Sequence, residues 1–229
     1  MKIIFLLAIL NFGALICNKS DGKIENRPKF NVEPSNLVET VISDNFIKPN
    51  YHWVVGEFDG EGTIDTVYEH VYSKKHKREI DSVPNIDNGE FNEIMKWYID
   101  QNTDLLISIK YKEKSTLHLG LARGLYCLIN IGDINHDGKD EIAIVIDYFD
   151  ESKLNSCKIY TLCNRKWKLL HQFTISENAF DMTEENSKFN QIDGYLECKN
   201  EIWHYLDMEN EFNDKDEASM EVLKISTCE

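Results

Sequence analysis

The sequence predicts a mainly β fold with a few short helices, arranged as two β-meander units in one domain. Short apolar segments rich in β-branched residues recur along the chain with turn residues between them, which is typical of strands. The pattern of apolar strand, acidic loop and apolar strand occurs twice, with loops at 57–65 and 133–141. Repetition of this kind indicates repeated supersecondary structure. A chain of 229 residues is long enough for a core of its own, and we expect a single β-rich domain over residues 36–229.

The first 17 residues have the composition of an export signal. Lys2 precedes an apolar run over residues 3–16, which is shorter than the roughly 20 residues a membrane-spanning helix needs. Cys17 ends this run, in the place of the lipidated cysteine of bacterial lipoproteins. We therefore expect an exported protein, either an outer-membrane lipoprotein anchored through Cys17 or a periplasmic or secreted protein without a lipid.

Residues 18–35 are polar, include two prolines, and are predicted to form a flexible tether. A short helix is expected over 36–44, because Asn36 and Glu39 have the spacing of a capping box and apolar residues follow at helical intervals.

The next elements surround the first acidic loop. Strands are predicted at 52–55 and 65–72, followed by a positively charged turn at 74–79. Residues 87–90 are expected to cap a second helix, whose apolar face carries Phe91, Ile94, Met95 and Tyr98.

From residue 104 onward, short runs of apolar and β-branched residues follow one another, and we expect each run to form a strand. A turn at 164–166 and an acidic loop at 207–217 interrupt this pattern. The predicted strands are 105–109, 125–131, 142–148, 157–163, 167–175, a closing hairpin of 194–196 and 202–206, and a last strand at 220–225.

The loop at 133–141 has the composition of a calcium loop. Side-chain oxygens stand at alternate positions, and Gly138 permits the sharp turn that points them inward. An EF-hand would need a glutamate at its twelfth position, which is Ile144, and flanking helices in place of these β-branched flanks. A metal-free acidic turn is the alternative. The predicted ligands are the side chains of Asp133, Asn135, Asp137 and Glu141 and the backbone carbonyl of Lys139.

The first loop aligns with the second without a gap, so that Gly56 matches Gly132 and Asp65 matches Glu141. Its longer Glu side chains make calcium binding there a separate question. The corresponding candidate metal ligands are Glu57, Asp59, Glu61, Thr63 and Asp65.

These loops resemble the FG-GAP or VCBS-type repeat, the calcium-loop unit of integrin-type β-propellers and of many secreted bacterial proteins. Asp133, Asn135, Asp137 and Gly138 fit the repeat, whereas Glu141 replaces its usual final aspartate. The resemblance implies two propeller-blade-like units, each with a strand–calcium loop–strand hairpin. A complete propeller has 4–8 blades, so it is not implied here. The chain also resembles small exported proteins of Bacteroidetes-type bacteria.

Charge and cysteine content limit the partners and the chemistry. A net charge of −15 argues against nucleic-acid binding and suits cation binding. Export permits disulfides, and with five cysteines besides Cys17 at least one is free if all pairing is within the chain. Cys157 and Cys163 lie on the same face of one predicted strand and should not pair with each other. The pairing among Cys127, Cys157, Cys163, Cys198 and Cys228 is otherwise open.

No catalytic motif stands out. The nucleophile elbow, the zinc-protease His pair and the phosphate-binding glycine loop do not occur in the sequence. His118 is expected to be a hydrogen-bonded structural residue, and His136 is expected to face solvent. The sequence predicts an exported, calcium-stabilised, non-catalytic binding or structural module of the bacterial cell envelope, with a protein or glycan partner. The alternatives are a calcium-dependent hydrolase of glycans or peptides and an acidic inhibitor or immunity-type protein.

Overall fold

The computed structural model describes residues 45–109, 115–150, 152–180, 189–209 and 219–228. In these ranges the chain is mainly β with one α-helix, as predicted, and none of its antiparallel sheets closes on itself. The predicted export signal, Cys17, the tether and the helix at 36–44 lie outside the described residues. No helix within the described ranges has the length and apolar content needed to cross a membrane.

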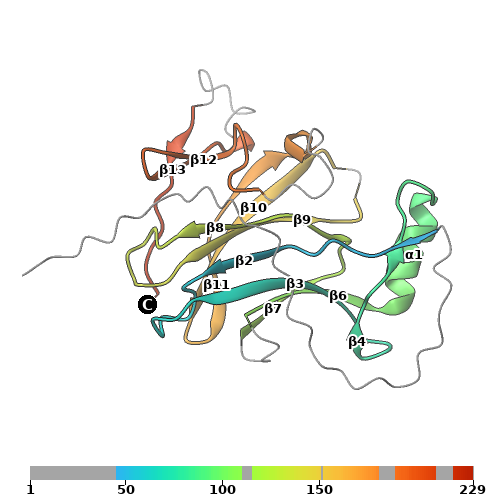
Figure 1. The fold of residues 1–229 in the computed structure, drawn as a ribbon. Coiled ribbons are helices and arrows are strands. Elements are labelled where there is room, and N and C mark those ends of the chain that lie inside the picture. Colours follow the sequence, from blue (N-terminus) through green and yellow to red (C-terminus); the bar gives the residue numbers. More distant parts are fainter. Residues whose placement is uncertain (1–44, 110–114, 151, 181–188, 210–218, 229) are drawn as a thin grey trace, which may run out of the picture.

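The first sheet contains five strands, and its main path runs in chain order through β2 (Trp53–Gly56), β3 (Asp65–Ser73), β6 (Thr103–Ser108) and β7 (Thr116–Gly120). The two-residue strand β4 (Arg78–Glu79) turns back onto β3. Residues 74–78 of this turn are exposed, which confirms the predicted charged hairpin turn. The helix α1 (Phe91–Gln101) lies between β3 and β6 in the sequence and at one end of the sheet in the structure (Figure 1).

The second sheet repeats this order with β8 (Gly124–Gly132), β9 (Glu141–Asp147), β10 (Leu154–Cys163) and β11 (Lys166–Ser176). In both sheets the acidic loop connects the first strand to the second. The strand pairs that close the two loops are equivalent, Gly56 with Asp65 and Gly132 with Glu141. The two loops therefore have equivalent closing pairs, but beyond this pair a bulge at Ile131 shifts the pairing of β8 by one residue, and β2 has no such bulge.

The remaining elements are short. The three-stranded C-terminal sheet has the order β12-β13-β14, and a two-stranded ribbon pairs β1 with β5. Their bounds are β1 Phe46–Ile47, β5 Val83–Pro84, β12 Leu196–Lys199, β13 Ile202–Tyr205, β14 Glu221–Val222, and the 3-10 helix η2 Glu177–Phe180.

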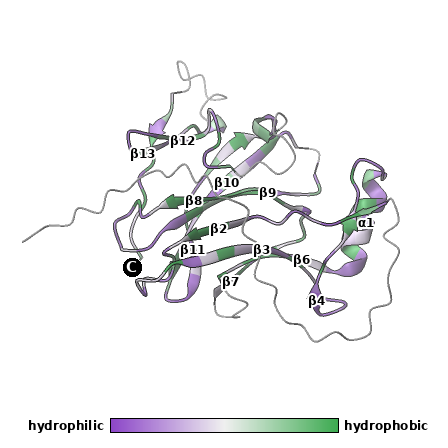
Figure 2. Ribbon diagram, viewed as in Figure 1, coloured by the Kyte–Doolittle hydropathy of each residue, from purple (hydrophilic) through white to green (hydrophobic). Residues whose placement is uncertain are grey.

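The first and second sheets pack against each other around a shared apolar core. Val67 and Leu105 of the first sheet and Ile142 and Ile144 of the second are fully buried in it. Figure 2 shows apolar stretches, in green, along β3 and β8. The arrangement is a two-layer β-sandwich in which period-2 alternation selects the inward side chains.

A second core covers the opposite face of the second sheet. Val145 and Ile159 of the sheet pack with Leu196 and Trp203 of the C-terminal sheet. The second sheet is therefore buried on both faces, and residues 141–146 of β9 are all buried. This double burial explains why the sequence of β9 is a continuous apolar run and not an alternating one.

Several elements differ from the prediction. The closing hairpin pairs Leu196–Lys199 with Ile202–Tyr205, so its first strand begins where the predicted 194–196 ended. The strand β7, a short Thr-Leu-His-Leu-Gly segment, was not predicted. The expected last strand at 220–225 is reduced to Glu221–Val222. In α1, Ile94 and Tyr98 are buried as predicted, but Phe91 is 39% exposed because it lies in the first, outermost turn.

Candidate functional site

The second acidic loop folds its side-chain oxygens onto its own backbone. The two carboxylate oxygens of Asp133 accept hydrogen bonds from the backbone N–H groups of Asp137 (3.0 Å) and Gly138 (2.9 Å). The Asn135 Oδ1 accepts from the Asp137 N–H at 2.9 Å, and the Asp137 Oδ1 accepts from the Lys139 N–H at 3.2 Å. The side chains at alternate positions thus all point to the inside of the loop, as the sequence pattern predicts.

Left-handed backbone conformations make this turn possible. Gly138 has φ +85° and Gly132 has φ +75°, values that glycine adopts without a steric penalty. His136 also has a positive φ, +59°, and its side chain is exposed. The prediction that His136 faces solvent is confirmed.

Glu141, the last residue of the loop, is fully buried. Its Oε2 accepts a hydrogen bond from the Ile134 N–H and its Oε1 accepts one from the Asn135 Nδ2, both at 3.0 Å. Burial raises the pKa of Glu141 to about 8. The Thr161 side chain and the hydrogen bond from Ile134 lower this pKa, and the negative charges of Asp137 and Asp133 raise it. When it is ionised, the Glu141 carboxylate therefore has uncharged hydrogen-bond donors but no positively charged partner beside it.

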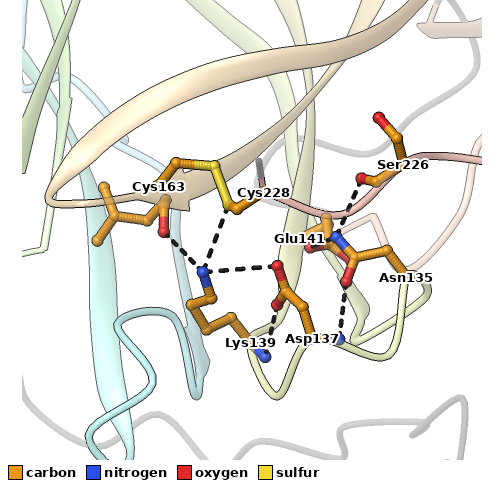
Figure 3. Close-up of a disulfide and its surroundings, with 8 residues drawn as sticks. Asn135, Asp137, Lys139, Glu141, Cys163, Ser226 and Cys228 are labelled. Atoms are coloured by element: carbon orange, nitrogen blue, oxygen red, sulfur yellow. Dashed lines mark hydrogen bonds and ion pairs between the residues drawn. A yellow bond between two sulfur atoms is a disulfide. The ribbon is translucent and has the colours of Figure 1, made fainter.

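Lys139 supplies the positive charge at this loop. Its Nζ is 3.5 Å from the Asp137 Oδ2, donates a hydrogen bond to the Leu162 carbonyl at 3.2 Å, and lies 3.4 Å from the Cys228 Sγ (Figure 3). The Asp137 Oδ2 is buried and accepts no hydrogen bond. The loop thus contains one ammonium group and four carboxylates, those of Asp133, Asp137, Asp140 and Glu141.

The first loop is more open than the second. Asp59 Oδ1 accepts a hydrogen bond from the Glu61 N–H at 3.0 Å, but Glu61 and Thr63 are exposed. Asp65 is only 3% exposed, in the position equivalent to Glu141. The Glu57 Oε1 is buried and accepts no hydrogen bond. The structure therefore brings the ends of this loop together but leaves its middle residues in solvent.

A polar bridge joins the two loops. The Asp140 N–H donates to the Glu57 carbonyl at 2.6 Å, and the Asp140 Oδ2 accepts from the Glu57 N–H at 3.1 Å. Asn130 Nδ2 donates to the same carboxylate at 2.8 Å and to the Val55 carbonyl at 2.9 Å. Sequence analysis missed both residues. A polar Asn130 inside an otherwise apolar strand was the one signal that could have indicated them.

The donor set of the second loop fits a hard cation, because its candidate ligands are all oxygens. Within the described ranges, no group of three or more His, Cys, Asp and Glu side chains could hold an ion as they stand. The carboxylates of Asp133, Asp137 and Glu141 instead accept hydrogen bonds from backbone N–H groups of the loop. The residues that would hold an ion here are Asp133, Asn135, Asp137 and Glu141 through side-chain oxygens and Lys139 through its backbone carbonyl.

A hydrogen-bonded series on the first sheet has the order found in some hydrolases. His70 Nε2 lies 3.1 Å from the Ser108 Oγ, and His70 Nδ1 lies 2.9 Å from the Glu79 Oε1. A nucleophile must be within reach of its substrate, but Ser108 is 2% exposed and His70 is 6% exposed. We interpret this series as a structural network.

Asp104 forms a second buried polar group on the same sheet. Its carboxylate contacts His118 Nδ1 at 2.8 Å and Lys74 Nζ at 2.9 Å, and accepts a hydrogen bond from the Gly120 N–H at 3.1 Å. Burial opposes ionisation, but His118 and Lys74 outweigh it and hold the pKa of Asp104 below its usual range. The expected hydrogen-bonded role of His118 is confirmed.

The cysteines are divided between disulfides and buried thiols. Cys163 is bonded to Cys228, and Cys198 is also in a disulfide. Cys127 and Cys157 are free and buried, so the prediction that at least one cysteine is free is confirmed, as is the absence of a Cys157–Cys163 bond. Cys127 and Cys157 pair with Val145 from opposite sides, which places them two strands apart, at about 10 Å, beyond disulfide reach.

Comparison with protein-family models, with curated proteins and with solved structures finds no match for this chain. Any functional conclusion therefore rests on the residues of the loops and their surroundings.

Proposed function

We propose that this protein is an exported, calcium-stabilised, non-catalytic binding or structural module of the bacterial cell envelope, with the second acidic loop as its calcium site. The observation that carries the proposal is the burial of Glu141 beside Asp133 and Asp137. In the described part of the chain no Lys or Arg side chain is bonded to the Glu141 carboxylate, whose polar neighbours are the uncharged Ile134 N–H, Asn135 amide and Thr161 hydroxyl.

Charge balance is the physical reason for assigning a cation to this loop. An ionised carboxylate is costly to bury unless an opposite charge compensates it. Lys139 is directed at Asp137 and not at Glu141. A divalent cation ligated by oxygens of the loop would neutralise the remaining charge and favour the ionised form of Glu141. The ion would hold the turn between β8 and β9 and with it the register of the central sheet.

We further propose that the two sheets are propeller-blade-like units related to the FG-GAP repeat. The support is that each acidic loop joins the first and second strands of a four-stranded meander, with equivalent closing pairs. Asp140 couples the first loop to the second through Glu57. Calcium at the first loop, held by Glu57, Asp59 and Asp65, is a weaker part of the proposal because its middle residues are exposed.

The partner we propose is a protein or a glycan, with a membrane contact only through a lipid on Cys17. The net charge of −15 supports a partner other than nucleic acid. The burial of Ser108 supports a non-catalytic role over the hydrolase alternative, because the hydrogen-bonded series has no accessible nucleophile.

The test is thermal unfolding of the chain from Cys17 onward, with calcium and with a chelator. Calcium at 100-fold over its dissociation constant should stabilise the fold by about 2.7 kcal/mol. For a domain of this size that corresponds to a rise in Tm of about 5–10 °C. Asp137→Ala should abolish the shift. Asp100→Ala, which removes an exposed carboxylate on α1, should preserve it. A parent chain whose Tm is the same with calcium and with chelator would contradict the proposal.

A further inference from the structure

The Cys163–Cys228 disulfide ties the end of the chain to the sheet that carries the second loop. Cys163 is the last residue of β10, and the bond closes a sequence separation of 65 residues. Figure 3 shows the disulfide next to Lys139, Asp137 and Asn135. The bond is thus located beside the candidate calcium site.

The segment held by this bond, residues 219–228, is called the C-terminal strap below. It has a second attachment on the C-terminal sheet, where the Leu223 N–H donates to the Trp203 carbonyl at 2.8 Å and the Leu223 side chain is buried in the second core. Between Leu223 and Cys228 the strap passes the second acidic loop. Its path is therefore fixed at both ends, by packing at one and by a covalent bond at the other.

The strap makes contact with two of the predicted loop residues. Asn135 Nδ2 donates to the Ser226 carbonyl at 3.4 Å while it also donates to Glu141 at 3.0 Å. Lys139 Nζ lies 3.4 Å from Cys228 Sγ and 3.5 Å from the Asp137 carboxylate. The same side chains that orient the loop oxygens are thus held in part by the strap.

We propose that the Cys163–Cys228 disulfide is a redox-controlled latch that holds the C-terminal strap against the second acidic loop and thereby sets the affinity of that loop for calcium. This inference rests on the calcium site proposed above. The oxidised latch keeps Asn135 and Lys139 in place, so the loop pays less conformational entropy when it binds an ion. Reduction removes the covalent tie and leaves the strap attached through Leu223 and its neighbours and through the hydrogen bond from Asn135 to Ser226.

The redox step requires an external dithiol. Its two thiols give two electrons and two protons to the S–S bond, which breaks to form the thiols of Cys163 and Cys228, while the dithiol closes to its own disulfide. Because coupling between two sites is reciprocal, calcium that binds the latched form more tightly must also stabilise the disulfide against reduction.

The first experiment is calcium titration by calorimetry on the parent chain and on Cys163→Ser/Cys228→Ser. We expect the double variant to bind calcium about fivefold more weakly or worse, at the lower end of typical coupling between sites. The matched control is Cys198→Ser, which removes a disulfide on β12 and none of the strap contacts with the loop. Equal affinity in the parent and the double variant would overturn the latch.

A second experiment needs no variant and remains available if the double variant does not fold. The parent chain is exposed to dithiothreitol with and without calcium, and alkylated Cys228 is followed by mass spectrometry. Calcium should slow the labelling of Cys228 but leave the labelling of Cys198 unchanged. Equal rates for Cys228 in the two conditions would overturn the proposal.

Hydrogen exchange separates failure of the latch from failure of the calcium site. If the parent chain binds no calcium, the proposed function fails, and the latch is then tested on its own in the metal-free protein. Residues 133–141 should exchange faster in the double variant than in the parent, with β3 unchanged. Identical exchange of the loop would show that the strap does not restrain it.

Discussion

At the scale of single residues, Glu141 decides how much negative charge is buried at the second loop. Glu141 is fully buried, and its equivalent in the first loop, Asp65, is also buried, with 3% of its surface exposed. The pKa of Glu141 is raised to about 8 by burial. Because this value lies above the ordinary 4.5, the contribution of Glu141 to stability is present below pH 4.5 and is lost as the pH rises through about 8 in the absence of an ion.

This shift predicts a pH-dependent calcium affinity. Binding requires the ionised carboxylate, so between pH 6 and 8 calcium should displace one proton and its affinity should rise by about tenfold per pH unit. Above pH 8 the affinity should level off. Titration calorimetry across pH 6–9 measures this slope. Glu141→Gln should bind weakly at every pH, and a parent affinity that is equal at pH 6 and pH 8 would contradict the assignment.

Gly56 has no room for a side chain. A Cβ at this position would lie 2.3 Å from the Asp140 Oδ2 and 2.4 Å from the Asn130 Nδ2, in the bridge between the loops. Gly56→Ala should therefore lower the free energy of unfolding by about 1–3 kcal/mol. Urea unfolding measures the loss. Gly62→Asn is the control, because Gly62 is in open space and Asn tolerates its left-handed backbone. Equal stability of both variants would contradict the steric argument.

At the scale of elements, Glu69 connects strands of different sheets. It lies on β3 and is 3% exposed. Its Oε1 accepts from the Leu125 N–H on β8 at 2.8 Å, and its Oε2 accepts from the His52 N–H at 2.7 Å and contacts His52 Nδ1 at 2.8 Å. One carboxylate therefore holds the start of β8 and the segment before β2 in position.

Removal of this carboxylate should be strongly destabilising. Glu69→Ala leaves the N–H groups of Leu125 and His52 without their acceptor, at about 1–3 kcal/mol each, and we expect a loss of about 2–6 kcal/mol in the free energy of unfolding. Chemical denaturation checks this value. Glu93→Ala, on the exposed face of α1, should change stability by less than about 0.5 kcal/mol. A similar small effect of Glu69→Ala would mean that water replaces the carboxylate.

The element predictions succeeded where the pattern is local. The strands on each side of both loops lie within about two residues of their predicted bounds, since apolar runs and turn residues mark them. The strand β7 could not be predicted, because its pairing with β6 depends on a neighbouring edge and not on its own residues.

For the whole molecule, the second sheet is the element that both cores share. Ile144 faces the sandwich core, and the next residue, Val145, faces the C-terminal core. Because β9 contributes side chains to both cores, disruption of the packing in one core should also destabilise the other. The molecule should behave as one cooperative unit.

This cooperativity can be measured with two substitutions on adjacent positions. Ile144→Ala should lower the free energy of unfolding by about 2–5 kcal/mol, and Val145→Ala should lower it by a somewhat smaller amount because it removes less volume. In both variants, far-UV circular dichroism and tryptophan fluorescence should report one coincident transition. Two separate transitions in Val145→Ala would show that the C-terminal sheet unfolds on its own.

Local spacing alone determined the acidic loops. The alternation of Asp133, Asn135 and Asp137 and the following glycine are properties of consecutive residues, and the hydrogen bonds from the loop backbone to these side-chain oxygens lie within the loop itself. Tertiary structure decided which of those charges are buried, that Asp140 bridges the loops, and that Cys228 pairs with Cys163. These contacts join residues 65 to 83 positions apart. Their partners depend on how the sheets pack, which short-range periodicity does not specify.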